Sequence, residues 1–332
     1  MSVATSKWHC LALSREGEVY SWGDGHDGSL GHTDGGTRAV PSRIESLSRV
    51  ESIAAGDNRT SAAVDEGGRL FTWGRAAFPT HDTMPSGLGY ALDSQTESQL
   101  TPKCVDALSK DRVMGVALGL GFTLAVTDAG AVFSFGYTLS GALGHGSLEA
   151  EVLPRRIEAL TQTERRFVAV AAGDGHALAL TEEGELYGWG CEDANGHGQY
   201  EYIPHQVISF VGQRVKYVDT GDNSSCAVTG KGELFTWGDG SCGQLGHGDE
   251  KHQLTPKRVE RLNGNKVTAA ATCETLTLVV NEDGVLFAIG DRTTLGLHDP
   301  DEDEDEDSVG YPVLLPTLCM RARKSPDVLP FR

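Results

Sequence analysis

The sequence predicts an all-β fold, a six-bladed β-propeller of four-stranded blades, and three recurring features indicate this class. A tight turn between two apolar strands occurs six times, an aromatic-glycine pair follows each turn, and a proline opens a further short strand after each pair. The pairs lie 51, 62, 54, 48 and 52 residues apart, and no segment has convincing helical periodicity. Repeated four-stranded sheets around an axis form a propeller.

The elements of one unit follow in a fixed order. The turns are REGEVY (15–20), EGGRLF (66–71), DAGAVF (128–133), EEGELY (182–187), GKGELF (230–235) and EDGVLF (282–287). The pairs that follow are Trp22-Gly23, Trp73-Gly74, Phe135-Gly136, Trp189-Gly190, Trp237-Gly238 and, in degenerate form, Ile289-Gly290. The prolines are Pro41, Pro102, Pro154, Pro204, Pro256 and Pro312. The fourth strand lies near positions 56, 119, 173, 221 and 273, so only five copies follow a proline strand.

The N-terminus supplies the sixth copy of that strand. MSVATSKWHCLALS aligns with VAVAAGDGHALALT, which places Val3 on Val170 and His9 on His176. We therefore expect residues 1–13 to pair with the blade that contains Pro312 to Leu318, so that the N-terminal strand closes the ring and leaves no sheet edge exposed. This organisation predicts a single propeller domain over 1–318, with its ends meeting, and a short C-terminal tail over 319–332.

A dinucleotide-binding motif is the main competing interpretation of one stretch. WGDGSCGQLGHG at 237–248 contains G-x-G-x-x-G at Gly238, Gly240 and Gly243. A strand precedes these glycines, but two more glycines and then Pro256 follow, and such a segment cannot hold the helix whose N-terminus would bind a pyrophosphate. We interpret the glycines as turn residues and expect some of them to have positive φ or to crowd a neighbouring strand.

The repeat as a whole resembles the regulator of chromosome condensation (RCC-type) family of β-propellers. The pattern G-D-x-H-x-x-A-L, a turn, W-G-x-x-x-x-G-Q-L-G-H-G and T-P is fully formed at 173–190 and 237–256, and the resemblance extends over essentially the entire chain. The sixth unit departs from it at Cys273 and Ile289, and the fourth has NGHGQY in place of the G-Q-L-G-H-G run. That family usually has seven blades, so a seven-bladed ring is the alternative to the six units counted.

Repetition also assigns most of the reactive side chains to structural roles. His9 and His176 share one repeat position and His32, His145 and His247 share another, so we expect them to hold turns together. Trp22, Trp73, Trp189 and Trp237 are expected to pack between blades. Seven cysteines occur singly, which predicts neither a zinc site nor a disulfide framework. With no catalytic motif, export signal or apolar span, we expect no enzymatic activity, no cofactor or metal, and a cytoplasmic or nuclear location.

The charge of the chain points to the class of its partner. Lys and Arg number 28 and Asp and Glu 47, a net charge of −19, and the run 301–307 (DEDEDED) supplies seven of the negative charges. Such a surface argues against a nucleic-acid ligand, which requires a basic face. The run is open to three interpretations: a solvated loop, a loose calcium site that lacks the glycine and terminal Glu of an EF-hand, or an electrostatic attractant for a basic partner.

These features predict a monomeric, non-enzymatic protein-interaction module or regulatory scaffold that contacts neither nucleic acid nor membrane. The alternative, implied by the family resemblance, is guanine-nucleotide exchange on a small Ran-like GTPase, although no residue here matches an exchange motif. Long insertions at 75–98 and 298–310 occupy the same segment of the repeat, so both should emerge on one face beside the loop near 24. The candidate residues for binding a basic protein partner are Asp24, His26, Asp301, Glu302, Asp303, Glu304 and Asp305.

Overall fold

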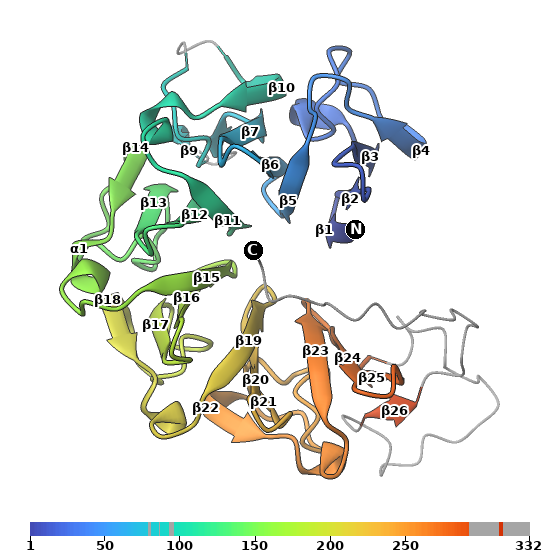
Figure 1. Ribbon diagram of the computed structural model, residues 1–332, viewed down its shortest axis with the longest axis vertical. Coiled ribbons are helices and arrows are strands. Elements are labelled where there is room, and N and C mark those ends of the chain that lie inside the picture. Colours follow the sequence, from blue (N-terminus) through green and yellow to red (C-terminus); the bar gives the residue numbers. More distant parts are fainter. Residues whose placement is uncertain (79–80, 86, 93–95, 292–311, 315–332) are drawn as a thin grey trace.

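Six four-stranded antiparallel sheets are arranged in a ring around one axis, which confirms the predicted six-bladed β-propeller (Figure 1). The structure is a computed structural model that describes residues 1–78, 81–85, 87–92, 96–291 and 312–314. Among these described residues, no helix is long and apolar enough to cross a lipid bilayer.

The first three blades occupy the N-terminal half of the chain. Blade 1 contains β1 (Ser2–Thr5), β2 (His9–Leu13), β3 (Val19–Gly23) and β4 (Arg38–Arg43). Blade 2 contains β5 (Val50–Gly56), β6 (Thr60–Asp65), β7 (Leu70–Arg75) and β10 (Ser98–Cys104), and the hairpin β8 (Ala77–Phe78) and β9 (His81–Pro85) lies within its insertion. Blade 3 contains β11 (Val113–Leu118), β12 (Phe122–Thr127), β13 (Val132–Gly136) and β14 (Glu151–Arg156).

The other three blades follow the same order. Blade 4 contains β15 (Phe167–Ala172), β16 (His176–Thr181), β17 (Leu186–Gly190) and β18 (Glu201–Gln206). Blade 5 contains β19 (Val215–Thr220), β20 (Ser224–Thr229), β21 (Leu234–Gly238) and β22 (Gln253–Arg258). Blade 6 contains β23 (Val267–Thr272), β24 (Leu276–Asn281), β25 (Leu286–Gly290) and β26 (Val313–Leu314). Short helical turns occur at His26–Gly28, Asp106–Leu108, Glu158–Thr161 (α1), Ile208–Phe210 and Glu260–Leu262.

The predicted pairing of the N-terminal strand with the last blade is wrong. β1 pairs with β2, its neighbour in the chain, with Val3 opposite Ala12, and the outer strand β26 of blade 6 pairs with β25. Every blade is built from strands that follow one another along the chain. A hairpin between consecutive strands needs only a short loop, so its closure costs little chain entropy, whereas pairing β1 with a strand 300 residues away would require the whole ring to form first. Leu315 to Leu318, the rest of the predicted partner, lie outside the described residues.

Stacking of the blades explains why their second strands are apolar on both faces. Every residue of β6, β12, β16 and β20 is buried, because each sheet is covered by a neighbouring blade on either side. Five hydrophobic clusters join blade 1 to 2, 2 to 3, 3 to 4, 4 to 5 and 5 to 6. The outer strands carry the repeat proline, for example Pro154 in β14 and Pro204 in β18, and proline cannot donate a hydrogen bond to an added strand.

The glycines of the G-x-G-x-x-G stretch have the structural role predicted for them. Gly238 has φ 108° and Gly243 has φ 69°, a region that favours glycine. A Cβ atom on Gly238 would lie 2.3 Å from the carbonyl oxygen of Asn223, and one on Gly240 would lie 2.2 Å from that of Lys251. The glycines therefore allow the β21–β22 loop to fold tightly against its neighbours, as expected.

The repeat histidines have structural roles, but the prediction that they hold turns together is confirmed only in part, because His176 joins strands of two blades. His9 Nε2 lies 2.7 Å from Ser61 Oγ and His176 Nε2 lies 2.8 Å from Ser225 Oγ, so each ring bridges to the next blade. His32, His145 and His247 instead bond within their own blade, to Ser21, Ser134 and Thr236. Burial lowers the pKa of His9 and of His176 to about 4, because a buried imidazole disfavours the charged form.

The prediction that four tryptophans pack between blades is confirmed for three of them. Trp73, Trp189 and Trp237 are fully buried, and the indole N–H of each donates to a backbone carbonyl of the preceding blade. Trp22 is only half-buried, so the prediction is wrong there. It lies on the face of blade 1 that points away from blade 2, and no hydrophobic cluster of described residues joins that face to blade 6.

Candidate functional site

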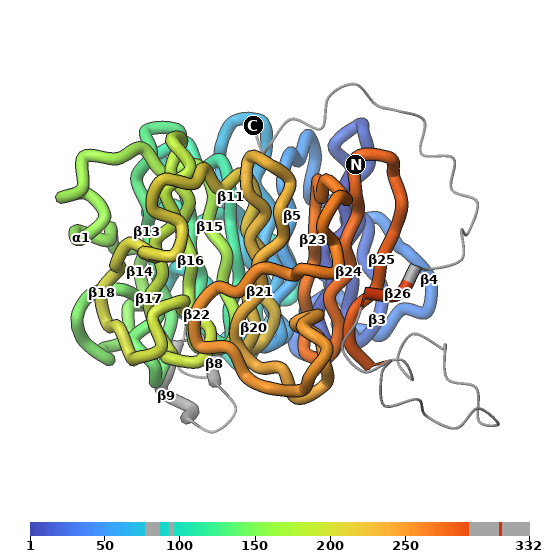
Figure 2. The backbone as a smooth tube through the Cα atoms, turned by 90° about the horizontal axis from the view of Figure 1, so that it is seen from below, coloured from blue at the N-terminus to red at the C-terminus, as the bar shows by residue number. Residues whose placement is uncertain are grey.

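Two sets of loops leave the same end of the ring, which we call the loop face. Because consecutive strands are antiparallel, the loops between first and second strands and those between third and fourth strands must emerge at one end of each blade. Asp24 N, in a loop of the second set, donates to Trp8 O, in a loop of the first set, at 2.9 Å. Figure 2 views the ring edge-on with the N-terminus at the upper end, so the loop face is the lower end.

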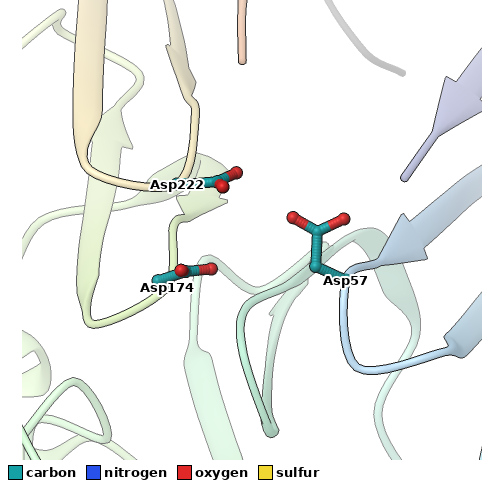
Figure 3. A group of neighbouring side chains, drawn as sticks. All are labelled: Asp57, Asp174 and Asp222. Carbon is teal, nitrogen blue, oxygen red and sulfur yellow. The ribbon is translucent and has the colours of Figure 1, made fainter. Parts of the chain in front are cut away.

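Three aspartates from separate blades converge where the loop face meets the axis. Asp57, Asp174 and Asp222 each follow a glycine at the end of an inner strand or directly after it, and each has a carboxylate oxygen within 4.8 Å of the others (Figure 3). Equivalent loops of blades 6 and 1 place Glu274 and Lys7 beside them. We call these five residues the axial ring.

Lys7 is the internal counter-charge of the axial ring. Its Nζ lies 2.6 Å from Asp222 Oδ2 and 3.4 Å from Glu274 Oε2, and its backbone N–H donates to Asp57 Oδ1 at 2.8 Å. Burial opposes the charged ammonium, but the hydrogen bond and the charge of Asp222 outweigh it and raise the pKa of Lys7. Four carboxylates against one ammonium leave a formal charge of −3 at this point on the axis.

Two carboxylates of the axial ring, Asp174 and Asp57, have raised pKa values, mainly because they are partly buried. Burial, reinforced by the negative charge of Asp222, raises the pKa of Asp174 to about 6. Burial also raises the pKa of Asp57, against the hydrogen bond that it accepts from Lys7 N. The negative charge of Asp222 contributes to both shifts, and an added cation would offset that contribution, so the axial ring can accept a further positive group.

An axial channel of about 630 Å³ opens behind the ring and is lined by the inner strands of all six blades. Its wall is made mainly of Ala, Val and Thr side chains, with one half-buried acid, Asp219. Burial raises the pKa of Asp219 to about 7, although its Oδ2 accepts a hydrogen bond from Thr272 N at 3.0 Å. Asp219 is therefore only partly ionised near neutral pH and adds less negative charge than an ordinary aspartate would.

The predicted residues Asp24 and His26 lie on the loop face, in the β3–β4 loop of blade 1. Asp24 Oδ1 accepts from His26 N at 2.9 Å and lies 2.5 Å from His26 Nδ1. Burial alone would raise the pKa of Asp24, but these two hydrogen bonds and the charge of Arg59 lower it. His26 is exposed. Asp301, Glu302, Asp303, Glu304 and Asp305 lie outside the described residues.

Arg59 ties this loop to blade 2 and to the exposed Trp8. Its guanidinium bonds to Asp24 Oδ2 at 2.9 Å and to Asp27 Oδ2 at 3.3 Å, and it stacks 4.4 Å from the centroid of the Trp8 ring. Arg75 Nη2 also binds Asp27 Oδ2, at 2.6 Å. Asp24 is thus already paired within the protein, whereas the four carboxylates of the axial ring share one lysine.

Sequence reasoning did not identify the axial ring, although a signal for it was present. The G-D pairs at 56–57, 173–174 and 221–222 occupy corresponding places in the repeat, and Lys7 aligns with Asp174. Loops that follow the innermost strands of a propeller surround one axis, so acids in several of them must come together. No such signal was present for Arg59, Asp27 and Trp8. Their contacts join loops between first and second strands to a loop between third and fourth strands, and these loops do not correspond in the repeat.

Comparison with known proteins identifies the family. Models of the regulator of chromosome condensation (RCC1) repeat match residues 16–63, 129–180 and 231–280, and a second model of that repeat matches 2–29, 167–199 and 215–244. Over 79% of this chain, identity is 39% to human E3 ubiquitin-protein ligase HERC2 and 35% to the Arabidopsis thaliana ultraviolet-B receptor UVR8. The chain spans 5% of the first and 58% of the second.

Solved structures agree on the fold. Prp20p of Saccharomyces cerevisiae superimposes with a TM-score of 0.78 at 22% identity, over 96% of this chain and 77% of that one. Human WBSCR16 gives 0.79 at 20% identity, over 96% of this chain and 81% of that one. With the repeat matches across the sequence, the chain belongs to the regulator of chromosome condensation (RCC1) repeat family.

Proposed function

We propose that this propeller is a non-enzymatic protein-interaction module that binds a basic protein partner on its loop face. The observation that carries the proposal is the axial ring, in which four carboxylates from four blades face a single lysine. A cluster of like charge at a channel mouth focuses its field and attracts an oppositely charged surface. The same face carries Trp8 stacked on Arg59, and exposed aromatic and arginine side chains are common anchors at protein interfaces.

Nucleotide exchange on a small Ran-like GTPase is the second candidate. Its support is the similarity to Prp20p, whose reported structure concerns binding to Gsp1p and to histones. Exchange needs no bond made or broken by the propeller, so it is compatible with a binding face. We rank it second because the loop-face residues described above form an acidic site for a basic group and supply no feature specific to a nucleotide pocket. Under either candidate we propose a monomer acting in the cytoplasm or nucleus.

Core histones are a suitable basic probe for the first candidate. The triple variant Asp57→Asn, Asp174→Asn, Asp222→Asn removes the aspartates of the axial ring at nearly constant volume. The matched control is Glu16→Gln, Glu183→Gln, Asp283→Asn, which removes three exposed carboxylates from turns at the opposite end. We expect histone affinity, measured by fluorescence anisotropy at about 0.15 M salt, to fall at least about tenfold in the first variant and to change little in the second.

Three results would count against this proposal or its ranking. Equal losses in the two variants would show that binding follows net charge and not the axial ring. Accelerated nucleotide release from a Ran-like GTPase at catalytic amounts of the propeller, with no histone affinity, would favour the exchange function instead. Unaltered binding in both variants would remove the loop face as the histone site.

A further inference from the structure

The face of blade 6 that points away from blade 5 is exposed where the same face of every other blade is buried. Leu278 and Leu286 are 37% and 36% exposed, and Val280 between them is half-buried. The equivalent leucines and valines of blades 1 and 4 are at most 5% exposed, and Leu11, Val19 and Leu186 among them are 0% exposed. We call Leu278, Val280 and Leu286 the terminal face.

The other five blades show which residues cover such a face. After each proline strand, the chain makes one short turn that places two apolar side chains against the preceding sheet. These buried pairs are Ile44 and Leu47, Val105 and Leu108, Ile157 and Leu160, Val207 and Phe210, and Val259 and Leu262. Each pair belongs to the hydrophobic cluster between its own blade and the next, so the turn itself seals part of the interface.

The sixth copy of this pattern continues in the sequence beyond β26. Measured from the repeat proline, the five pairs lie at the third and sixth positions, as in Pro154, Ile157 and Leu160. Pro312 is followed at the same positions by Leu315 and Leu318. Leu314, the last residue of β26, pairs with Phe287, the residue next to Leu286 of the terminal face.

We propose that the segment 315–332 of this chain docks on the terminal face, with Leu315 and Leu318 in the places that the five described pairs occupy. The two leucines are apolar, as is the leucine-rich terminal face that they would cover. The end of β26, from which the segment continues, lies beside this face. The inference is independent of the proposed function, because the terminal face lies between blades and not on the loop face.

Cysteine labelling in the full-length protein tests this docking. Leu286→Cys places a thiol in the terminal face, and its labelling rate is followed by peptide mass spectrometry, with the exposed Cys273 as reference and the buried Cys226 as the monitor of global unfolding. Adding Leu315→Asp and Leu318→Asp should raise the rate at position 286 by about tenfold or more, because charged residues would release the segment. The matched control Leu329→Asp changes a leucine of the same segment that is not at the third or sixth position after Pro312, and it should leave the labelling rate at position 286 unchanged.

A milder pair, Leu315→Ala and Leu318→Ala, keeps the test informative if the aspartate variant unfolds and Cys226 becomes reactive. It should raise the rate at position 286 while Cys226 stays protected. Equal labelling rates with and without the substitutions would overturn the proposal. So would protection of position 286 that increases with protein concentration alongside a dimer on size-exclusion chromatography, because a second copy would then cover the terminal face.

Discussion

Replacing equivalent tryptophans of different blades measures how tightly each seam of the ring, the interface between two neighbouring blades, is packed. Trp189 is fully buried in the cluster between blades 3 and 4, and its indole N–H donates to Ala142 O at 2.7 Å. Trp22 occupies the same repeat position in blade 1 but is half-buried. The same substitution to alanine should therefore have very different costs.

The magnitude for Trp189→Ala follows from its burial. Removing a fully buried large aromatic side chain from a core costs about 3–5 kcal/mol, which includes the cavity left behind. The unpaired carbonyl of Ala142 adds to this cost, since a buried acceptor left without a donor is unfavourable by about 1–3 kcal/mol. Trp22→Ala loses less contact, because part of its surface is already in water, and we expect about 1–2 kcal/mol.

Guanidinium chloride denaturation of the two variants and the parent gives the free energies of unfolding by linear extrapolation. The expected result is a loss for Trp189→Ala at least about twice that for Trp22→Ala. Phe135→Ala, at the corresponding buried position of blade 3, is a second reference and should resemble Trp189→Ala. Equal losses for Trp22 and Trp189 would refute the reasoning, because they would mean that the seam between blades 6 and 1 is packed like the other five.

Three further outcomes are expected. Gly238→Ala should lower the melting temperature without changing histone affinity, because the new Cβ would lie 2.3 Å from Asn223 O at a φ of 108°; a loss of histone affinity with unchanged melting would contradict this. The pKa of His176 is about 4 in the folded protein and near 6.5 in the unfolded chain, so the unfolded chain binds a proton first and the free energy of unfolding should fall as the pH drops from 6.5 towards 4. His176→Gln should make this dependence on pH weaker, and an unchanged dependence would exclude this histidine as its source. Replacing 301–307 with Ser and Asn, or shortening 76–97, should slow histone association and weaken its salt dependence around the ionic strength where the screening length is about 8 Å; unchanged rates in both would remove these insertions from the binding face.

The repeat could be predicted from the sequence because its markers are local. Turn glycines, the Trp-Gly pair and the edge proline each have a conformational reason to recur, and their spacing alone requires four strands per unit. These markers could not predict which strand begins each blade. A ring of equal units has no unique starting strand, and His9 aligns with His176 whether β1 begins blade 1 or ends blade 6, so only the strand pairing decides.

The site was harder to predict because it depends on contacts between units. Asp24 and His26 lie on the loop face, as the rule that equivalent loops emerge together requires, but the pairing of Asp24 with Arg59 depends on a loop of the next blade. Predicting the axial ring would require two facts together: Asp57, Asp174 and Asp222 share one repeat position, and the inner strands surround one axis. The half-burial of Trp22 had no sequence signal, since the WGDG stretch that it begins is identical to the one that Trp237 begins.

Hydrogen exchange of the propeller with and without core histones tests the binding face most directly. The account predicts that bound histones slow amide exchange in the loops that carry the axial ring, at 56–59, 173–175 and 221–223. The turns at the opposite end, at 66–68, 182–184 and 230–232, should exchange at the same rate in the free and bound protein. Protection confined to those opposite turns, with unchanged exchange in the axial-ring loops, would contradict it.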